Sequence, residues 1–509
     1  MNILLETIEK LPETEALKQA IAQSRLPCSL ARVAAGARQH LAKSISGGRD
    51  VLFVCATEYE ARQRFSEYIY GNKILLPAPQ TELRPVETRG EELAGERIRA
   101  LCQMQKGGSV VFLSMDSLLF SMRPAAEFYG RFLCLAPGTV FPPEKLAEAL
   151  VALGYEGCAM VEGPGQVSGR GEIMEVFPPD AKAPYRITFF DDEVESIRPF
   201  DTDSQRSFGA GEAQICIPPA AEFCLDGEAR QALEHYLTGH GGEGVESFRA
   251  RYLFELSERG TFANIEAYAG LLPGKTSVLE YVQNPLLLFD GSVRVLEEQK
   301  KRMESRAAML QEILVDGGAF GCEAQAWADA EDFLEQNKAR CLDLEDIRQN
   351  KLLAEQTLDF AMRSTVGFGG SLERLAQAAK TRAEAGWQVY LMAGGRAAKL
   401  SESLAELGVL APVASEAGAS ITCVPLMVEE GLEISGAKQV FFSEMDIFGA
   451  KARGKAKRQK KKTAPTLLAD LRAGDLVVHE VHGKGRYNGL KTMEVAGASA
   501  EYMEIEYRD

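Results

Sequence analysis

The sequence predicts a multidomain α/β protein whose last segment is a small β domain. Its 509 residues are too many for one hydrophobic core and correspond to three or four domains of roughly 150 residues each. Short apolar segments alternate with charged, helix-forming segments over most of the chain, as in parallel sheets covered by helices. Near the end, apolar and polar residues alternate strictly in Glu501–Tyr507, which indicates a half-buried strand.

The first α/β domain is expected to consist of two separate parts, residues 1–122 and 208–330. In the first part, the predicted strands are 50–55, 73–76 and 109–113, and the predicted helices are 58–70 and 90–104. In the second part, an apolar run predicts a strand at 285–289, and a charged periodic segment predicts a long helix at 293–314. Because predicted strands and helices alternate in both parts, we expect the two parts to form one domain.

An α+β insert is expected between those parts, at residues 123–207. A helix is predicted at 143–153, and strands are predicted near 171–177, 185–190 and 194–200. The turn Asp191-Asp192-Glu193 joins the last two strands as a hairpin. Side chains alternate along a strand, so Arg186 and Phe190 point to one side and Ile187 and Phe189 to the other. One face of this strand can therefore be core while the other is a contact surface.

A further α/β domain is expected at residues 345–450. Its predicted helices and strands alternate at 371–385, 387–392, 396–407, 420–424 and 439–443. Residues 451–466 are interpreted as a basic linker that overlaps a short helix at 464–471, and 467–509 as the C-terminal domain. The chain stops two residues after the last predicted strand, so we expect this domain to be incomplete and the sequence to be truncated.

Composition favours a cytoplasmic protein without a membrane segment. The ten cysteines include no CxxC pair, which predicts reduced, mostly buried thiols and neither a disulfide framework nor a zinc site. The N-terminus lacks the basic start and apolar run of a secretory signal. No apolar stretch approaches the roughly 20 residues that span a bilayer. A monomer is expected.

Charge is distributed unevenly along the chain. The segment Lys451–Lys462 carries eight cations in twelve residues and no acid, whereas the whole chain has a net charge of -16. Most of the surface should therefore repel nucleic acid, and any phosphate contact should be local. The candidate phosphate contacts are Lys455, Lys457, Arg458, Lys460 and Lys461. A solvated linker, extended by its own charge, is the favoured interpretation of the same residues.

Two segments come close to a phosphate-binding loop, whose glycines expose backbone amides to phosphate while a lysine meets its charge. Ala269–Thr276 ends in GKT, but it starts with alanine and Pro273 removes one amide, so a turn is the better interpretation. Arg32–His40 (RVAAGARQH) lies where the first loop of such a domain is expected, but it lacks the GK[ST] ending. Gly36 and Arg38 therefore mark a degenerate, non-binding nucleotide site. No acidic box of the DExx type is recognised after a buried strand.

No catalytic residues are predicted. The segment His479–His482 is one residue shorter than the zinc-protease motif HExxH and lies in a strand-and-turn context, so it predicts no metal site. No Ser-His-Asp or Cys-His set is suggested by the sequence. On its residues alone, the chain is interpreted as a binding module.

Several segments resemble, in order and spacing, the family of bacterial transcription-repair-coupling factors (Mfd). Gly474–Tyr507, which starts GDLVVHEVHGKGRYNG, resembles the RNA-polymerase-interacting domain of that family. Gly169–Pro179 and Pro184–Asp201 resemble the inserted domain that the family shares with the excision-repair protein UvrB. Phe442–Gly449, followed by the basic run, resembles the family's strand end and linker. The resemblance covers essentially the whole chain and is weaker in residues 210–440.

The resemblance implies a UvrB-like, P-loop-derived domain whose phosphate loop has decayed, and a C-terminal barrel-like domain of the Tudor or CarD type. Residues 71–111 contain no Phe, Tyr or Trp, so the aromatic hairpin with which UvrB probes damaged DNA is also missing. The family's ATP-driven DNA translocase lies beyond the polymerase-binding domain. This chain is therefore expected to hold no cofactor. On the resemblance, ATP, magnesium and most DNA contacts belong to the translocase motor. Whether the chain itself has enzymatic activity is left open.

The resemblance also implies two protein partners. The family's UvrA-contacting residues carry over as Arg170, Arg186 and Phe190. Leu490 and Met493 lie near the family's contact with the β subunit of RNA polymerase, with a core position an equal alternative. The leading hypothesis is an adaptor for transcription-coupled DNA repair that binds stalled polymerase and recruits UvrA. The alternative is a UvrB-type enzyme that binds ATP and damaged DNA; a CarD-type regulator is disfavoured by the long α/β region ahead of the last domain.

Overall fold

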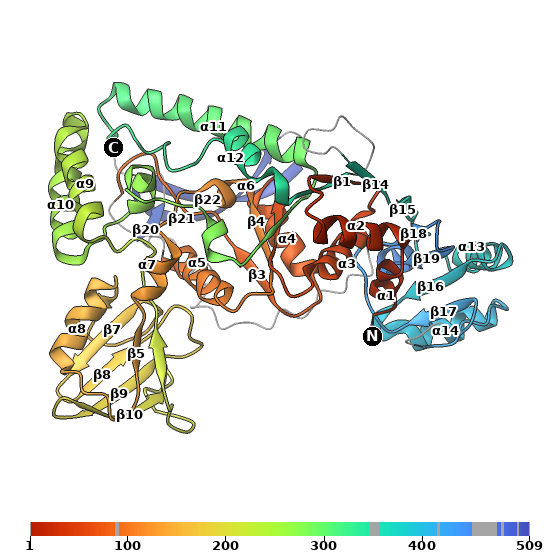
Figure 1. The fold of residues 1–509 in the computed structure, drawn as a ribbon, viewed down its shortest axis with the longest axis horizontal. Helices are drawn as coiled ribbons and strands as arrows, with labels where there is room; N and C mark the ends of the chain where they lie inside the picture. The colour runs from red at the N-terminus through yellow and green to blue at the C-terminus, as the bar shows by residue number, and fades with distance from the viewer. Residues whose placement is uncertain are drawn as a thin grey trace. The chain divides into compact units, whose positions relative to one another are not determined.

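The structure is a computed structural model that describes residues 2–86, 91–345, 356–414, 418–449, 476–479, 483–495 and 498–507. The chain divides into two compact units, Met1–Gly449 and Ala450–Asp509 (Figure 1). Each unit is described by itself. Of the described helices, none is long and apolar enough to cross a membrane.

A seven-stranded parallel sheet forms the central layer of the first α/β region (Figure 1). Its strands are β1 (Cys28–Ala31), β2 (Val51–Cys55), β3 (Lys73–Leu76), β4 (Val110–Ser114), β12 (Leu286–Phe289), β13 (Cys341–Glu345) and β14 (Gln356–Asp359). Their order in the sheet is β14-β1-β13-β12-β2-β4-β3. Strand β12 lies beside β2, so segments on both sides of the insert contribute to one sheet. The sheet also extends past residue 330, because β13 and β14 complete it.

Both faces of this sheet are buried, which explains why its strands read as continuous apolar runs. Leu52 and Val54 belong to the core on one face, and Val51 and Phe53 to the core on the other. The helices of this α/β region are α1 (Ile3–Glu9), α2 (Pro12–Ala22), α3 (Ala35–Ser46), α4 (Glu58–Glu67), α5 (Glu91–Met104), α6 (Met115–Leu119), α7 (Ala125–Gly130), α9 (Gly227–Gly239), α10 (Glu246–Arg259), α11 (Ser292–Val315) and α12 (Ala330–Asn337).

The segment that ends in GKT is a turn, as the sequence predicts. Its first three residues end the 3-10 helix η2 (Ile265–Leu271), and Gly274 in the turn that follows adopts φ +64°. The Lys275 ammonium donates to the carbonyl of Gly270 within the same turn. Further 3-10 turns are η1 (Glu243–Val245), η3 (Val278–Tyr281), η4 (Lys338–Arg340) and η5 (Gly394–Arg396).

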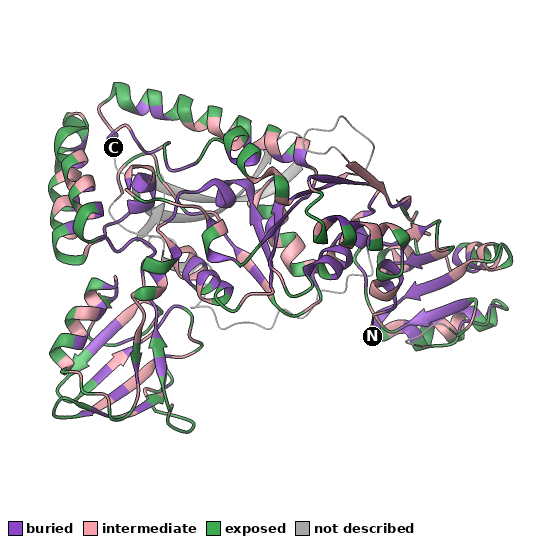
Figure 2. Cartoon of the chain, viewed as in Figure 1, coloured by how far each residue is buried: buried purple, intermediate pink, exposed green. Residues whose placement is uncertain are grey.

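The insert is a small, mostly antiparallel α+β fold with its own core (Figure 2). Its main sheet has the order β10-β9-β8-β7-β6, formed by β6 (Glu156–Gly157), β7 (Gln166–Arg170), β8 (Ile173–Val176), β9 (Tyr185–Phe190) and β10 (Glu193–Pro199). Helix α8 (Pro143–Ala152) supplies Leu146 and Leu150 to the core beneath this sheet. The predicted hairpin is present, because Phe190 pairs with Glu193 across a two-residue turn.

A second, two-stranded sheet contradicts the expectation that every cysteine is a free thiol. Strand β5 (Leu133–Leu135) pairs with β11 (Ile215–Ile217), and Cys134 lies directly opposite Cys216 and forms a disulfide with it. This bond could not be predicted from sequence, because the two cysteines are 82 positions apart and only strand pairing brings them together. The other eight cysteines are free, and most of them are buried, as predicted.

The region from 362 to 449 contains a further sheet, of five strands, with the order β15-β18-β19-β16-β17. Its strands are β15 (Met362–Ser364), β16 (Gln388–Met392), β17 (Ile421–Val424), β18 (Leu432–Ile434) and β19 (Gln439–Phe442). Helices α13 (Leu372–Glu384), α14 (Ala397–Glu406) and α15 (Glu444–Phe448) accompany it. The alternation of helix and strand predicted here is confirmed, although β15 and β18 run antiparallel to their neighbours.

The second unit contains a three-stranded antiparallel sheet in its described residues. The strands are β20 (Leu476–His479), β21 (Gly483–Val495) and β22 (Ala498–Tyr507), in the order β20-β21-β22. Strand β22 includes the predicted strand 501–507. The predicted helix 464–471 and the basic run 451–462 lie outside the described residues.

Candidate binding sites

The connection from β1 to α3 occupies the place of a phosphate loop, at the carboxyl end of a parallel strand and before a helix. Gly36 lies in the first turn of α3, and a Cβ atom at this position would overlap the carbonyl oxygen of Glu430. The backbone at residue 430, just before β18, is thus packed directly on the start of α3. Close backbone approach of this kind requires glycine at position 36.

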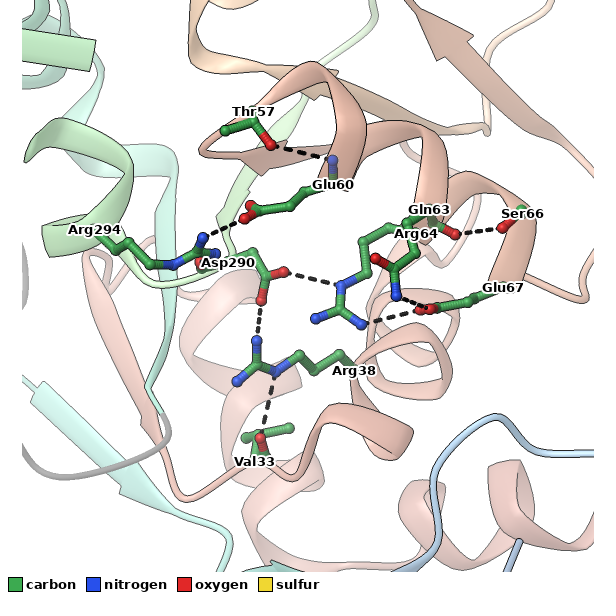
Figure 3. Close-up of polar contacts among 10 residues, drawn as sticks. All are labelled: Val33, Arg38, Thr57, Glu60, Gln63, Arg64, Ser66, Glu67, Asp290 and Arg294. Atoms are coloured by element: carbon green, nitrogen blue, oxygen red, sulfur yellow. Dashed lines mark hydrogen bonds and ion pairs between the residues drawn. The ribbon is translucent and has the colours of Figure 1, made fainter. Parts of the chain in front are cut away.

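A buried ion-pair network fills the space beside this helix (Figure 3). Asp290, which directly follows β12, accepts hydrogen bonds from Arg38 on α3 and from Nε of Arg64 on α4, the latter at 3.0 Å. Arg64 also pairs with Glu67 at 3.0 Å. The Asp290 side chain is 1% exposed and the Arg38 side chain 7%. Three separate segments of the chain therefore meet at one carboxylate.

The electrostatics of this network leave no cation for a phosphate. Burial opposes the charge of Arg64, but the carboxylates of Asp290 and Glu67 outweigh it and raise the pKa of the guanidinium above its ordinary value. Arg38 is likewise paired with Asp290. A cavity of about 10 Å³ remains among Gly36, Arg38, Arg64 and their neighbours. Ligand pockets usually measure about 300 to 1,000 Å³, so this site is closed.

Sequence reasoning did not identify Asp290 or Arg64 as parts of this site. The signal for Asp290 was present, because an acidic residue directly follows the buried run Leu286–Phe289, although it does not belong to a DExx box. Arg64 lies on a helix with many charged residues, and nothing in the sequence distinguishes it from the others. That Gly36 and Arg38 bind no nucleotide stays a prediction, for which the packed helix and the paired arginines supply a physical reason.

The outer face of the insert sheet brings two of the predicted partner-binding residues to the same end. Arg170 on β7 pairs with Ile173 on β8 across a tight turn, and Ile173 pairs with Thr188 on β9. Phe190 lies two residues beyond Thr188 on the same face of β9 and is 71% exposed. Ile187 and Phe189, on the other face, are buried in the insert core. One face of β9 is thus core and the other is open, as expected.

Arg186 is more fully engaged within the insert than Arg170, whose guanidinium donates to the carbonyl of Ala159. The Arg186 guanidinium donates to Glu175 on the neighbouring strand at 2.6 and 2.8 Å and to the carbonyl of Gln205 at 3.2 Å. It also stacks over the Phe200 ring, with 4.7 Å from its central carbon to the ring centroid. The side chain is 23% exposed. Arg186 therefore holds the sheet together as well as contributing to its surface.

Ile173 was missed by the sequence reasoning, although it lies between Arg170 and Thr188 on the exposed face. Ile173 is 40% exposed, although isoleucine is among the residues most often buried. A signal was available: Met174 and Val176 are buried, so the alternation in this strand places Ile173 and Glu175 outside. Arg170, Ile173, Thr188 and Phe190 form what we call the outer face of the insert.

In the second unit, the predicted polymerase-binding residues Leu490 and Met493 both belong to β21. Leu490 is opposite Met503 and Met493 is opposite Ala500 on β22. Strand β20 pairs with β21 at residues 483–486, and from Tyr487 onward β21 pairs with β22 alone among the described strands. This part of β21 thus has an edge without a described partner strand, next to a bulge at Tyr487–Gly489. The candidate phosphate contacts in the basic run lie outside the described residues.

Comparison with known proteins identifies two domains. Residues 133–223 match the sequence model of the UvrB interaction domain, and residues 471–509 match that of the CarD-like/TRCF RID domain. The transcription-repair-coupling factor of Bacillus subtilis is 25% identical over 459 residues, which are 86% of this chain and 39% of that protein. The same factor of Myxococcus xanthus is 26% identical over 531 residues (92% and 43%), and that of Mycobacterium tuberculosis 28% over 517 residues (93% and 41%). The chain thus spans about two fifths of the length of these curated relatives.

Proposed function

Because the chain is homologous to the N-terminal part, about 40%, of transcription-repair-coupling factors, we propose that it acts as an adaptor in transcription-coupled DNA repair. In this proposal the C-terminal domain binds the β subunit of stalled RNA polymerase and the insert recruits UvrA. Displacement of polymerase by ATP-driven translocation on DNA belongs to the full-length factor. The observation that carries the proposal is the outer face of the insert, an exposed face within the matched UvrB interaction domain.

The chemistry of this face suits a protein partner. Phe190 and Ile173 offer exposed apolar area at the turn end of the sheet, and Arg170 adds a cation beside them. Aromatic and arginine side chains are the residues that most often dominate protein interfaces, where truncation costs about 2 kcal/mol or more. Arg186 supports this face from within, because it ties β9 to β8 through Glu175. Polymerase binding would use the edge of β21 that has no partner among the described strands, to which a strand of the polymerase can add main-chain hydrogen bonds.

The alternative, a UvrB-type enzyme, requires a nucleotide site that the geometry disfavours. The arginines beside α3 are paired with Asp290, and the start of that helix is packed against residue 430. Between β3 and α5, the described residues 77–86 contain no strand that could form an aromatic probing hairpin. Saturable binding of ATP by this chain at micromolar concentration would favour the enzyme over the adaptor.

The proposed UvrA contact is tested by calorimetric titration of purified UvrA with the chain. Phe190→Ala should weaken binding by more than about tenfold, because it removes the most exposed aromatic side chain of the outer face without touching the core. Phe254→Ala is the matched control, since Phe254 is 65% exposed on α10, outside the matched domain. Equal affinity of the two variants for UvrA would refute the assignment.

A further inference from the structure

A disulfide joins the strands by which the chain enters and leaves the insert. Strand β5 precedes the main sheet of the insert in the chain and β11 follows it, and Cys134 on β5 is bonded to Cys216 on β11. The two strands form a two-stranded sheet over three residues each, which we call the β5–β11 ribbon. A two-stranded sheet by itself is marginally stable in water. The bond therefore secures a short ribbon that closes the two ends of the insert.

The two faces of the β5–β11 ribbon have different environments. Leu135, Ile215 and Ile217 are buried in the insert core. Side chains alternate along each strand, so Cys134 and Cys216 point away from that core, and both residues are exposed. Exposed disulfides are among the labile ones, because a dissolved thiolate can reach their sulfur atoms. The insert therefore does not have to unfold before this bond is reduced.

The ends of the insert are held by the neighbouring α/β core without help from the bond. Before β5, Arg131 pairs with Asp226 at 2.6 Å. After β11, Glu222 accepts hydrogen bonds from Arg97 on α5 at 2.7 and 3.0 Å, and both side chains are 3% exposed. Phe223 is buried in the core on one face of the seven-stranded sheet. Reduction therefore releases the ribbon without releasing the insert from the larger domain.

We propose that Cys134 and Cys216 are a reversible redox site, which exchanges with small thiols and opens the β5–β11 ribbon when it is reduced. In the cytoplasm, where we expect this chain, the disulfides that form are usually transient, catalytic or sensitive to redox state. The proposal concerns the insert itself and does not depend on the identity of its partner.

The exchange has two balanced steps. A small thiolate attacks one sulfur atom and forms a mixed disulfide, while the other cysteine leaves as a thiolate and takes up a proton. A second small thiolate attacks the mixed disulfide at the sulfur of the small molecule, which frees the remaining cysteine and yields a small-molecule disulfide. Two thiols are thus oxidised as one protein disulfide is reduced, and oxidised glutathione reverses the exchange.

The first test equilibrates the whole folded chain in mixtures of reduced and oxidised glutathione, followed by acid quenching, alkylation and mass spectrometry. We expect the bond between Cys134 and Cys216 to form in oxidised mixtures, to open in reduced mixtures without denaturant, and to form again when the mixture is reversed. Cys158, a free and partly buried cysteine of the same insert, is the internal reference and should form no bond with another cysteine of the chain. Absence of the bond in oxidised mixtures, or its reduction only in denaturant, would overturn the proposal.

The second test follows the ribbon by amide hydrogen exchange in the whole chain. Reduction should accelerate exchange in β5 and β11 roughly tenfold, because the cross-link no longer limits local opening, and it should leave β12 unchanged. Cys134→Ser with Cys216→Ser should exchange at the fast rate at every glutathione ratio, whereas the matched control Cys158→Ser should keep the dependence on the ratio. Equal exchange of β5 and β11 in the oxidised and reduced wild-type chain would contradict the proposal.

Discussion

At the scale of single residues, Asp290 engages both arginines that lie beside the start of α3. In a working phosphate loop, a cation and the helix amides are available to the ligand. Here Arg38 and Arg64 are both bound to Asp290, so their charges are neutralised inside the protein (Figure 3). The same carboxylate ties α3, α4 and the end of β12 together. Asp290 thus forms a structural contact between three elements at the place where a phosphate loop would lie.

Replacing Asp290 by alanine should therefore destabilise the protein strongly. Asp290→Ala leaves Arg38 buried without this carboxylate, and breaking a buried ion pair by removing one partner costs about 3 to 5 kcal/mol. The measurement is the free energy of unfolding in urea. Arg230→Ala is the control, because Arg230 and Glu234 form a surface pair whose loss should cost about 1 kcal/mol or less. Equal stability of the two variants would contradict this view of the network.

At the scale of the elements, the start of α3 depends on its contact with the segment before β18. Gly36→Ala places a Cβ atom against the carbonyl oxygen of Glu430, so the backbone at residue 430 or the helix must shift. We expect a loss of about 1 to 3 kcal/mol in unfolding free energy, the usual cost of overpacking a tight contact.

The matched control for this change is Gly395→Ala, since no described atom lies near the added methyl group at that position. It should have little effect on the denaturation midpoint or raise it slightly. If Gly36→Ala is as stable as Gly395→Ala, α3 is not held by the backbone at residue 430.

The elements themselves could largely be predicted from sequence, because local patterns determine them. The runs that became β2, β4 and β12 are apolar throughout, since both faces of the parallel sheet are buried. Two contacts could not be predicted from sequence, because each joins segments that are distant in the chain. They are the pairing of Cys134 with Cys216 and the contact between Arg38 and Asp290. The same limit applies to Arg186, whose ion pair with Glu175 depends on the register of β8 and β9.

For the candidate binding surface, alternation along β9 was sufficient to separate core from contact residues. Phe190 is exposed and Ile187 and Phe189 are buried, as the period of a strand requires. Ile173 needed the pairing of β8 with β9 as well, because only that register places it beside Thr188. Side chains on a neighbouring strand therefore enter such a surface only once the sheet order is known.

At the scale of the whole molecule, the proposed adaptor separates its two contacts into two units of the chain. The insert and its outer face belong to Met1–Gly449, and the sheet that matches the CarD-like/TRCF RID domain belongs to Ala450–Asp509. Each contact can therefore be removed by mutation without changing the other unit. This separation makes the bridging of two partners directly measurable.

The most direct test of the adaptor is whether immobilised RNA polymerase retains UvrA when this chain is added. The account predicts that the wild-type chain and Phe254→Ala retain UvrA on polymerase, whereas Phe190→Ala stays bound to polymerase but loses UvrA. Quantitative blotting of both proteins in the bound fraction gives the readout. Retention of UvrA that does not depend on the chain, or that is equal for Phe190→Ala and Phe254→Ala, would contradict the account.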